Sequence, residues 1–310
     1  MSSFADTDEL AVYPEPGAMK MLEVTCLYEA KDLLGEGPIW NEDEKALYWC
    51  DNIRSLVHRY DAAAGSTRTW QMKEEIGSLV FRQNGGIVAG MKSGFRFLDL
   101  ERGTSELVVR AEPDTDNCLN DGKCDRRGRY WCGTINRDLA TPNGGLYRLD
   151  PDLTCHKMES GIIASNGMAF SPDDRTLYFC DSRQDTVWAY DLDIESGTIS
   201  NRRVFISTKD VPGRVDGATV DTEGNYWCAH IHDWHIVCYA PDGVEKRRVK
   251  LPVQHPTMCT FGGDNYDVMY VTSGTRFLDP KVHGDQPLAG SLFAIHGIGA
   301  RGLPEPRFAG

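Results

Sequence analysis

A short pattern repeats six times along the chain, at intervals of 40 to 48 residues. Each copy holds a strand-like run, a break, a second strand-like run and a Gly turn, and its equivalent positions are Tyr48, Val88, Tyr130, Tyr178, Tyr226 and Tyr270. The units are rich in β-branched and aromatic residues and are punctuated by Gly, Asp and Pro, which indicates strands joined by turns. A period of this length with about four strands per unit is typical of a β-propeller. We therefore expect an all-β fold, a six-bladed β-propeller. The alternative, a pair of β-sandwiches, does not explain the regular spacing.

The 310 residues could form one domain or two. Since the six units follow one another without interruption, we expect a single domain over residues 21–300. A strand-like run, Met21–Ala30, precedes the first unit, and we expect it to pair into the last blade so that no strand edge stays open. Residues 1–20 and 301–310 are predicted to be loosely attached tails.

Charge and composition exclude several classes of protein. The chain has 46 acidic and 33 basic residues, so it lacks the basic face that nucleic-acid binding requires, and neither nucleic acid nor an anionic membrane is expected as a partner. We find no apolar run of about 18 residues and no signal-peptide pattern, which predicts a cytoplasmic protein without a membrane partner. Cys50, Cys132, Cys180 and Cys228 each follow a Tyr-aromatic pair, so they read as buried free thiols. A monomer or a weak homo-oligomer is expected.

Four acceptor side chains stand where polar residues can meet at the axis of a propeller. Glu36, Asn166 and Asp216 are each followed directly by Gly and then by a strand, and Asn120-Asp121-Gly122 is a fourth instance. Taken singly, such dipeptides are ordinary turn sequences. Together, Glu36, Asn166 and Asp216 offer only oxygen ligands, which suit Ca²⁺, Mg²⁺ or Mn²⁺, with Zn²⁺ and Fe²⁺ as further possibilities. Three protein ligands leave positions open for water and substrate, as in a catalytic metal site.

Further polar residues follow the inner strands. We expect His230 and His232 to contact substrate, because a His-x-His pair on a strand points both rings to one face. Metal ligation and a structural role remain alternatives for both, and for His235. Asn136, Arg137 and Asp138 follow the third inner strand and are placed at the mouth of the site, as are Asp181 and Arg183 after the fourth. Solvated loop positions are the alternative for these five.

Four motifs carry a resemblance to a known family: LGEGPIW, NDGKCDRRGRYWCGT, SNGMAFSPDDRTLYFCDS and VDGATVDTEGNYW. They resemble the regucalcin/gluconolactonase (senescence marker protein) family, in order and over roughly residues 23–295. The resemblance implies a six-bladed propeller with one catalytic divalent metal ion that hydrolyses sugar lactones. It implies Glu36, Asn166 and Asp216 as the metal ligands and Asn120 as a substrate-binding residue, with Asp121 beside it. In many relatives an Arg stands two residues before that Asn, whereas this chain has Cys118, which removes a bidentate donor.

Three functions follow from these residues. The first is a metal-dependent sugar lactonase, a carboxylic ester hydrolase of carbohydrate catabolism, in which Asp216 serves as general base. The second keeps the metal site but hydrolyses organophosphates or aryl esters, an option that the missing Arg at position 118 keeps open. The third is a calcium-binding or protein-docking propeller without activity. Nucleotide-binding and GxSxG motifs do not occur.

Overall fold

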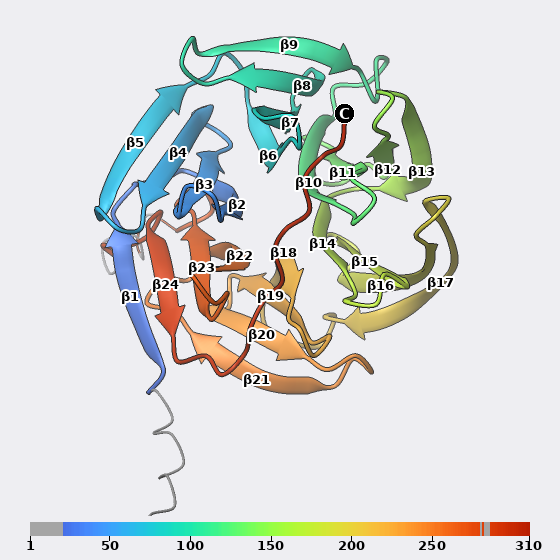
Figure 1. Cartoon of the computed structure of the whole chain (residues 1–310). Coiled ribbons are helices and arrows are strands. Elements are labelled where there is room, and N and C mark those ends of the chain that lie inside the picture. The colour runs from blue at the N-terminus through green and yellow to red at the C-terminus, as the bar shows by residue number, and fades with distance from the viewer. Residues whose placement is uncertain (1–20, 280, 282–285) are drawn as a thin grey trace, which may run out of the picture.

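Six four-stranded antiparallel sheets surround a central axis in the computed structural model, which describes residues 21–279, 281 and 286–310 (Figure 1). Each sheet is one blade, and its strands run in chain order from the axis outward in the first five blades. The predicted all-β, six-bladed propeller is confirmed. The expected tail over residues 1–20 lies outside the described residues.

The first three blades hold these strands: β2 (Gly35–Asn41), β3 (Ala46–Asp51), β4 (Leu56–Asp61) and β5 (Ser66–Gln71); β6 (Ile76–Phe81), β7 (Ile87–Met91), β8 (Gly94–Asp99) and β9 (Thr104–Val109); β10 (Cys118–Cys124), β11 (Tyr130–Ile135), β12 (Gly144–Leu149) and β13 (Cys155–Ile162). The other three hold these: β14 (Ser165–Phe170), β15 (Thr176–Asp181), β16 (Thr186–Asp193) and β17 (Thr198–Ser207); β18 (Arg214–Val220), β19 (Tyr226–Ile231), β20 (His235–Tyr239) and β21 (Glu245–Lys250); β22 (Pro256–Gly262), β23 (Val268–Ser273), β24 (Leu292–His296) and β1 (Glu23–Tyr28).

Burial falls from the axis to the rim of each blade. Every residue of β2, β6 and β10 is buried, whereas the outer strands β5 and β9 are half exposed. An inner strand packs against neighbouring blades on both faces, so its residues are buried without a break and do not alternate between buried and exposed. The six equivalent positions of the sequence repeat fall in the second strand of each blade, where all are buried.

The ring is closed by the strand that comes first in the chain. β1 pairs antiparallel with β24, with Glu23 opposite His296 and Tyr28 opposite Leu292. This is the pairing expected from the sequence. It leaves the last blade with four strands, like the other five.

The C-terminal segment crosses the end of the channel that faces the viewer in Figure 1. Phe308 is fully buried, its amide donates to the carbonyl of Phe81 at 2.8 Å, and Ala309 bonds Gly128. The buried Lys123 on β10 pairs with Glu305 at 2.5 Å. The expectation of a loosely attached tail at 301–310 is therefore wrong, because the segment covers apolar surface and satisfies a buried ammonium group.

In each of two blades, a buried aspartate accepts a hydrogen bond from the tryptophan six residues later. The carboxylate of Asp125 accepts a hydrogen bond from Trp131 Nε1 at 2.8 Å, and Asp221 accepts one from Trp227 at the same distance. All four side chains are buried. The bond satisfies the indole N–H, so the large ring can fill the blade core.

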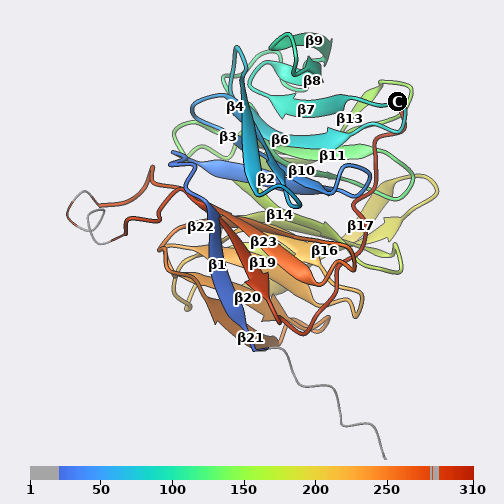
Figure 2. The same cartoon turned by 60° about the vertical axis from the view of Figure 1, so that its left-hand side comes forward.

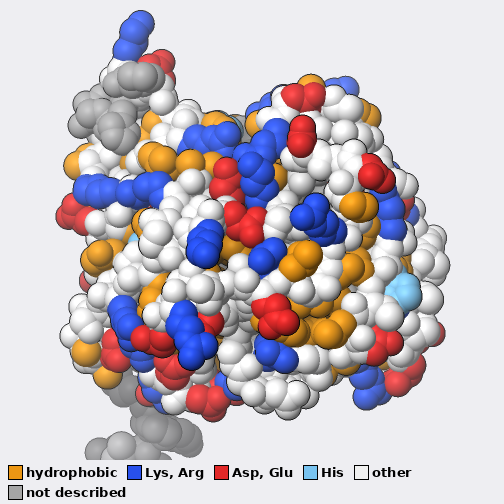
Figure 3. All heavy atoms as spheres, turned by 90° about the horizontal axis from the view of Figure 1, so that it is seen from above, with side chains coloured by type: hydrophobic (Ala, Val, Ile, Leu, Met, Phe, Trp, Pro, Cys, Tyr) orange, Lys and Arg blue, Asp and Glu red, His pale blue; other side chains and the backbone are white. Residues whose placement is uncertain are grey.

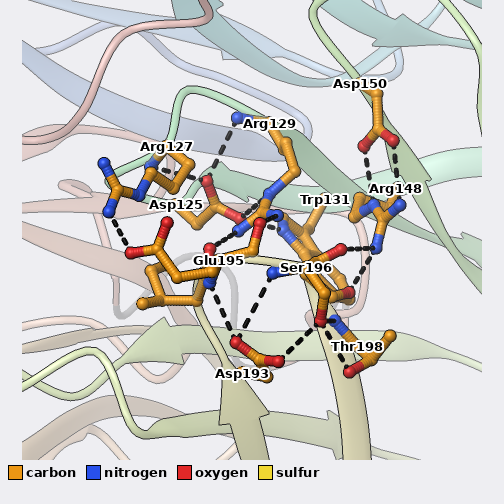
Figure 4. Close-up of polar contacts among 12 residues, drawn as sticks. Asp125, Arg127, Arg129, Trp131, Arg148, Asp150, Asp193, Glu195, Ser196 and Thr198 are labelled. Carbon is orange, nitrogen blue, oxygen red and sulfur yellow. Dashed lines mark hydrogen bonds and ion pairs between the residues drawn. The ribbon is translucent and has the colours of Figure 1, made fainter.

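Around Asp125 this contact widens into a link between two blades (Figure 4). Arg129 donates to Asp125 at 2.6 Å and to the carbonyl of Glu195, which lies in the turn between β16 and β17. Arg148 on β12 pairs with Asp150 at 2.6 Å and also reaches that turn. Two guanidinium groups thus tie the third blade to the fourth.

Charges of both signs are interspersed on the face shown in Figure 3. That face carries no extended basic patch. All ten cysteines are free thiols, as expected. Within the described part of the chain, no helix is long and apolar enough to cross a membrane.

Candidate active site at the end of the channel

The innermost strands place the four candidate acceptors at one recurrent position. Glu36, Asn120, Asn166 and Asp216 lie in β2, β10, β14 and β18, and the strand register shifts directly after or beside each of them. A β-bulge of this kind turns a side chain out of the regular alternation. From the sequence, each acceptor was expected to precede a strand. They lie within the strands instead, and the bulges aim them at the axis.

Glycine is required at positions beside these acceptors in the innermost strands. Gly37 and Gly167 follow Glu36 and Asn166 with φ angles of +57° and +59°, which favour glycine. Gly77 holds the equivalent position in β6, and a Cβ there would lie 2.3 Å from the carbonyl oxygen of Leu119. Gly77 therefore adds no side chain beside the acceptors, and the space next to them stays open.

That space is a cavity of about 250 Å³. Polar or charged side chains in its lining include Glu36, Asn52, Glu75, Asn120, Asn136, Arg137, Asn166, Ser182, Arg183, Arg214 and Asp216. Cys118, His232, Arg276 and Phe277 complete the wall together with aliphatic residues. The cavity lies at the opposite end of the channel from the C-terminal segment, because β10 runs from Cys118 in the cavity to the contact of Lys123 with Glu305.

Two acidic groups at the base of this cavity have no cationic partner among the described residues. Burial raises the pKa of Glu36 well above its usual value, and repulsion from Asp216 and Asp121 raises it further. The pKa of Asp216 is raised in the same way by burial and by Asp121. Because buried carboxylates are stable only when neutralised or paired, this pair is suited to bind a cation.

Asn166 is held in one orientation by its neighbours. Its Nδ2 donates to Ser182 Oγ at 2.8 Å, and its Oδ1 accepts from Asn120 Nδ2 at 3.1 Å. An amide oxygen has two acceptor sites, so Oδ1 can also face a cation beside Glu36 and Asp216. In the described part of the chain no three His, Cys, Asp or Glu side chains form a metal-binding group, so the donor set depends on this amide.

Arg137 brings a guanidinium group to the place where the sequence lacks one. Burial raises the pKa of the Cys118 thiol, and the nearby charge of Arg137 opposes that rise. Arg137 is held by Glu75, whose Oε1 lies 3.2 Å from its Nη1. The third blade thus supplies from its β11–β12 loop the charge that is missing at position 118.

Three predicted substrate contacts are corrected by the structure. His230 is fully buried, with its ring nitrogens facing the carbonyl of Pro212 and the hydroxyl of Tyr239, outside the cavity. Asp138 is exposed and accepts hydrogen bonds within its own turn, from Ala140 and Thr141.

The third correction is Asp121. Its Oδ2 accepts from the amide of Met168 at 2.9 Å, and burial raises its pKa to about 6. It acts on Glu36 and Asp216 through its charge and does not line the cavity.

The buried Asp181 does not line the cavity either, because its carboxylate accepts from the amides of Ile163 and Ala164. Several of the remaining predicted residues reach the wall. Asn136 and His232 line the cavity, as do Cys118 and Asn120. The two histidines of the His-x-His pair diverge because β19 ends at Ile231 and His232 has a φ of +73°. His235 does not line the cavity and contacts Asp233 instead.

Several wall residues had no signal in the sequence. Asn52, Glu75, Ser182, Arg214, Arg276 and Phe277 come from five blades and share no motif. Only their position at the cavity end of a strand unites them, and the strand boundaries are needed to see it.

Comparison with known proteins gives the family. Residues 34–275 match the model of the SMP-30/gluconolactonase/LRE-like region family. The chain belongs to this family. A relative from Pseudomonas putida, 6-deoxy-6-sulfogluconolactonase, is 33% identical over 92% of this chain and 98% of its own length. A pentonolactonase from Haloferax volcanii is 35% identical, over 92% of this chain and 98% of its own.

A solved member of the SMP-30/gluconolactonase/LRE-like family has the same fold. The crystal structure of regucalcin from Agrobacterium tumefaciens, described as a calcium-binding protein, superposes with a TM-score of 0.87 at 27% identity. The match covers 91% of this chain and 96% of that one. The propeller is therefore shared along nearly the whole length of both chains.

Proposed function

We propose that the protein is a metal-dependent lactonase that opens a sugar lactone to the aldonic acid. The observation that carries this proposal is the convergence of Glu36, Asn166 and Asp216 in one cavity, with two buried carboxylates that lack a cationic partner among the described residues. Lactonase relatives from Pseudomonas putida and Haloferax volcanii support it.

The donor set fits a divalent cation. It consists of two carboxylates and one amide oxygen, and such oxygen ligands suit Ca²⁺, Mg²⁺ or Mn²⁺. The description of the Agrobacterium regucalcin as a calcium-binding protein supports the binding of a divalent cation. When bound, such an ion supplies Lewis-acid polarisation of the ester carbonyl.

Proton transfer and substrate binding are assigned to different side chains. Asp216 accepts a proton from the attacking water at a carboxylate oxygen while the water oxygen bonds to the carbonyl carbon. The bond from that carbon to the ring oxygen then breaks, and the proton passes to the ring oxygen, which becomes a hydroxyl group. Asn120 donates to the carbonyl of Ser165 and to Asn166, which leaves its Oδ1 to accept from a sugar hydroxyl.

Hydrolysis of organophosphates or aryl esters has less support. That alternative depended on the loss of a guanidinium group at position 118, and Arg137 brings one to the same side of the cavity. A phosphotriester and an aryl ester therefore serve as comparison substrates.

The test measures proton release from a neutral hexonolactone by protein treated with a chelator and then supplied with Ca²⁺, Mg²⁺, Mn²⁺ or Zn²⁺. We expect activity to vanish on chelation and to return with at least one ion. Asp216→Ala and Glu36→Gln should lower kcat/KM roughly 10³-fold or more. The exposed Glu106→Gln on β9 is the matched control. Undiminished lactone hydrolysis after chelation, or in Asp216→Ala, would contradict the proposal.

A further inference from the structure

The cavity carries more positive charge than the proposed metal site uses. Its lining holds three carboxylates, of Glu36, Glu75 and Asp216, and four guanidinium groups. Glu75 pairs with Arg137. Glu36 and Asp216 are the ligands of a dication under the proposed function, on which the present inference rests. Three arginines remain, which we call the arginine wall: Arg183, Arg214 and Arg276.

Protein groups engage these three arginines only in part. Arg183 donates from Nε to the carbonyl of Leu139 at 3.0 Å, which leaves both terminal nitrogens for a ligand. Arg214 Nε lies 3.3 Å from Asp185 Oδ1, but the two are not aligned as a hydrogen bond. Arg276 lies over the ring of Phe277. Among the described residues, no carboxylate forms an ion pair with Arg183 or Arg276.

The wall is built from three neighbouring blades. Arg183 follows β15, Arg214 is the first residue of β18, and Arg276 follows β23. The segment after β23 stands out from the ring on the side opposite the C-terminal segment (Figure 2). Three guanidinium groups therefore approach one opening from different directions.

The charges of Arg214 and Arg183 both act on His232, which lines the cavity. Burial lowers the pKa of His232, and the charges of Arg214 and Arg183 lower it further. Both guanidinium groups therefore lie near this ring on the cavity wall. An anion placed there would relieve the repulsion among them.

The distance to the reacting end is short. Arg214 and Asp216 are two residues apart on β18, so their Cα atoms are separated by roughly 7 Å along the strand. A six-carbon chain can span this distance. A lactone whose carbonyl lies at Asp216 can therefore present the far end of its chain to Arg214.

We propose that the arginine wall binds an oxyanion substituent on the lactone, so that the preferred substrate is an acid-substituted hexonolactone. Sulfonate, phosphate and carboxylate share the required chemistry, since planar guanidinium groups bind such oxygens with charge-assisted hydrogen bonds.

The kinetic test compares four hexonolactones in the presence of metal: the neutral compound and analogues that carry a terminal sulfonate, phosphate or carboxylate. We expect at least one acidic analogue to exceed the neutral lactone in kcat/KM by about 100-fold. Arg183→Gln, Arg214→Gln and Arg276→Gln should each lower that preference by roughly 10-fold or more. The exposed Arg102→Gln is the matched control. The identity of the best analogue tells which oxyanion the wall selects.

Binding provides a second measurement that does not depend on turnover. Calorimetry compares a hexose with its sulfonated, phosphorylated and carboxylated derivatives on the wild type and on the three variants. If the neutral lactone is turned over as well as the acidic ones, the lactonase function stands and the inference is overturned. If no lactone is hydrolysed but an acidic sugar binds through the arginines, the proposed function falls and only the oxyanion binding by the arginine wall stands. Equal binding of neutral and acidic sugars, or binding that ignores the three substitutions, overturns it.

Discussion

Asn166 donates a hydrogen bond to Ser182 at 2.8 Å, and Ser182 in turn donates to the carbonyl of Val215 at 2.5 Å. Val215 directly precedes Asp216, so one chain of bonds joins two proposed metal ligands from neighbouring blades. Ser182 is buried and has no role of its own in the proposed chemistry. We assign it as a positioning residue that fixes the amide of Asn166.

Ser182→Ala should weaken metal binding by about 10-fold to 100-fold, because groups that orient metal ligands contribute on this scale. The measurement is a titration of chelator-treated protein with the activating ion. Activity should recover at saturating metal, since the three ligands remain. Ser207→Ala, an exposed position on β17, is the control. Wild-type metal affinity in Ser182→Ala would show that Asn166 needs no such support.

Asp216→Asn should stabilise the metal-free protein while it abolishes activity. Without a cation, the Asp216 carboxylate is buried beside Glu36 and Asp121. Replacing it with a neutral isostere removes repulsion, which we expect to raise the free energy of unfolding by about 1–3 kcal/mol. Urea denaturation in the presence of a chelator measures the change, and excess metal should reverse the order of the two proteins. A chelated variant less stable than the wild type would disprove the proposed electrostatic penalty.

His255 should make the protein less stable as the pH falls. The ring is 2% exposed, its Nδ1 has no hydrogen-bond partner in the described structure, and burial lowers its pKa to about 4. The unfolded chain takes up this proton near pH 6.5, before the folded one does, so stability is lost as the pH falls from about 6.5 toward 4.

The loss from this residue amounts to about 2 kcal/mol at pH 5 and about 3 kcal/mol near pH 4. Urea midpoints at pH 7.5 and pH 5 measure it, and His255→Gln should show the smaller difference between them. Thr104→Ser, at an exposed position without a titratable side chain, should keep the wild-type slope. An unchanged slope in His255→Gln would mean that other groups carry the dependence.

Phe308→Ala should destabilise the protein by about 3 kcal/mol or more, as expected for a fully buried aromatic ring. Urea denaturation measures this value, and Arg301→Ala at an exposed site of the same segment is the comparison. A loss below about 1 kcal/mol would restore the expectation of a loosely attached tail.

The propeller could be predicted because each blade is local in sequence. Residues such as Tyr130 and Tyr226 recur at equivalent points of units whose strands pair with the next strand along the chain. The C-terminal segment could not be recognised in this way. Its residues 301–310 include Gly and Pro at four positions, and Phe308 meets Phe81, which is remote in the chain.

The acceptors at the axis were found because a glycine follows each of them within two residues. Arg214 and Arg276 have no such signature, and they share a wall only because the ring brings β18 and the end of β23 together. The error at His230 has a different cause. The sequence shows alternation along a strand, but it does not show that β19 ends one residue before His232.

The pairing of β1 with β24 also governs when the molecule can fold. Thr25 bonds the carbonyl of Ala294, a contact across 269 residues of the chain. Contacts of such long range form slowly, and the pairing of β1 with β24 cannot begin before Leu292 has left the ribosome. During synthesis the earlier blades therefore stand as an open arc with exposed strand edges, and the ring closes only when the two distant strands meet.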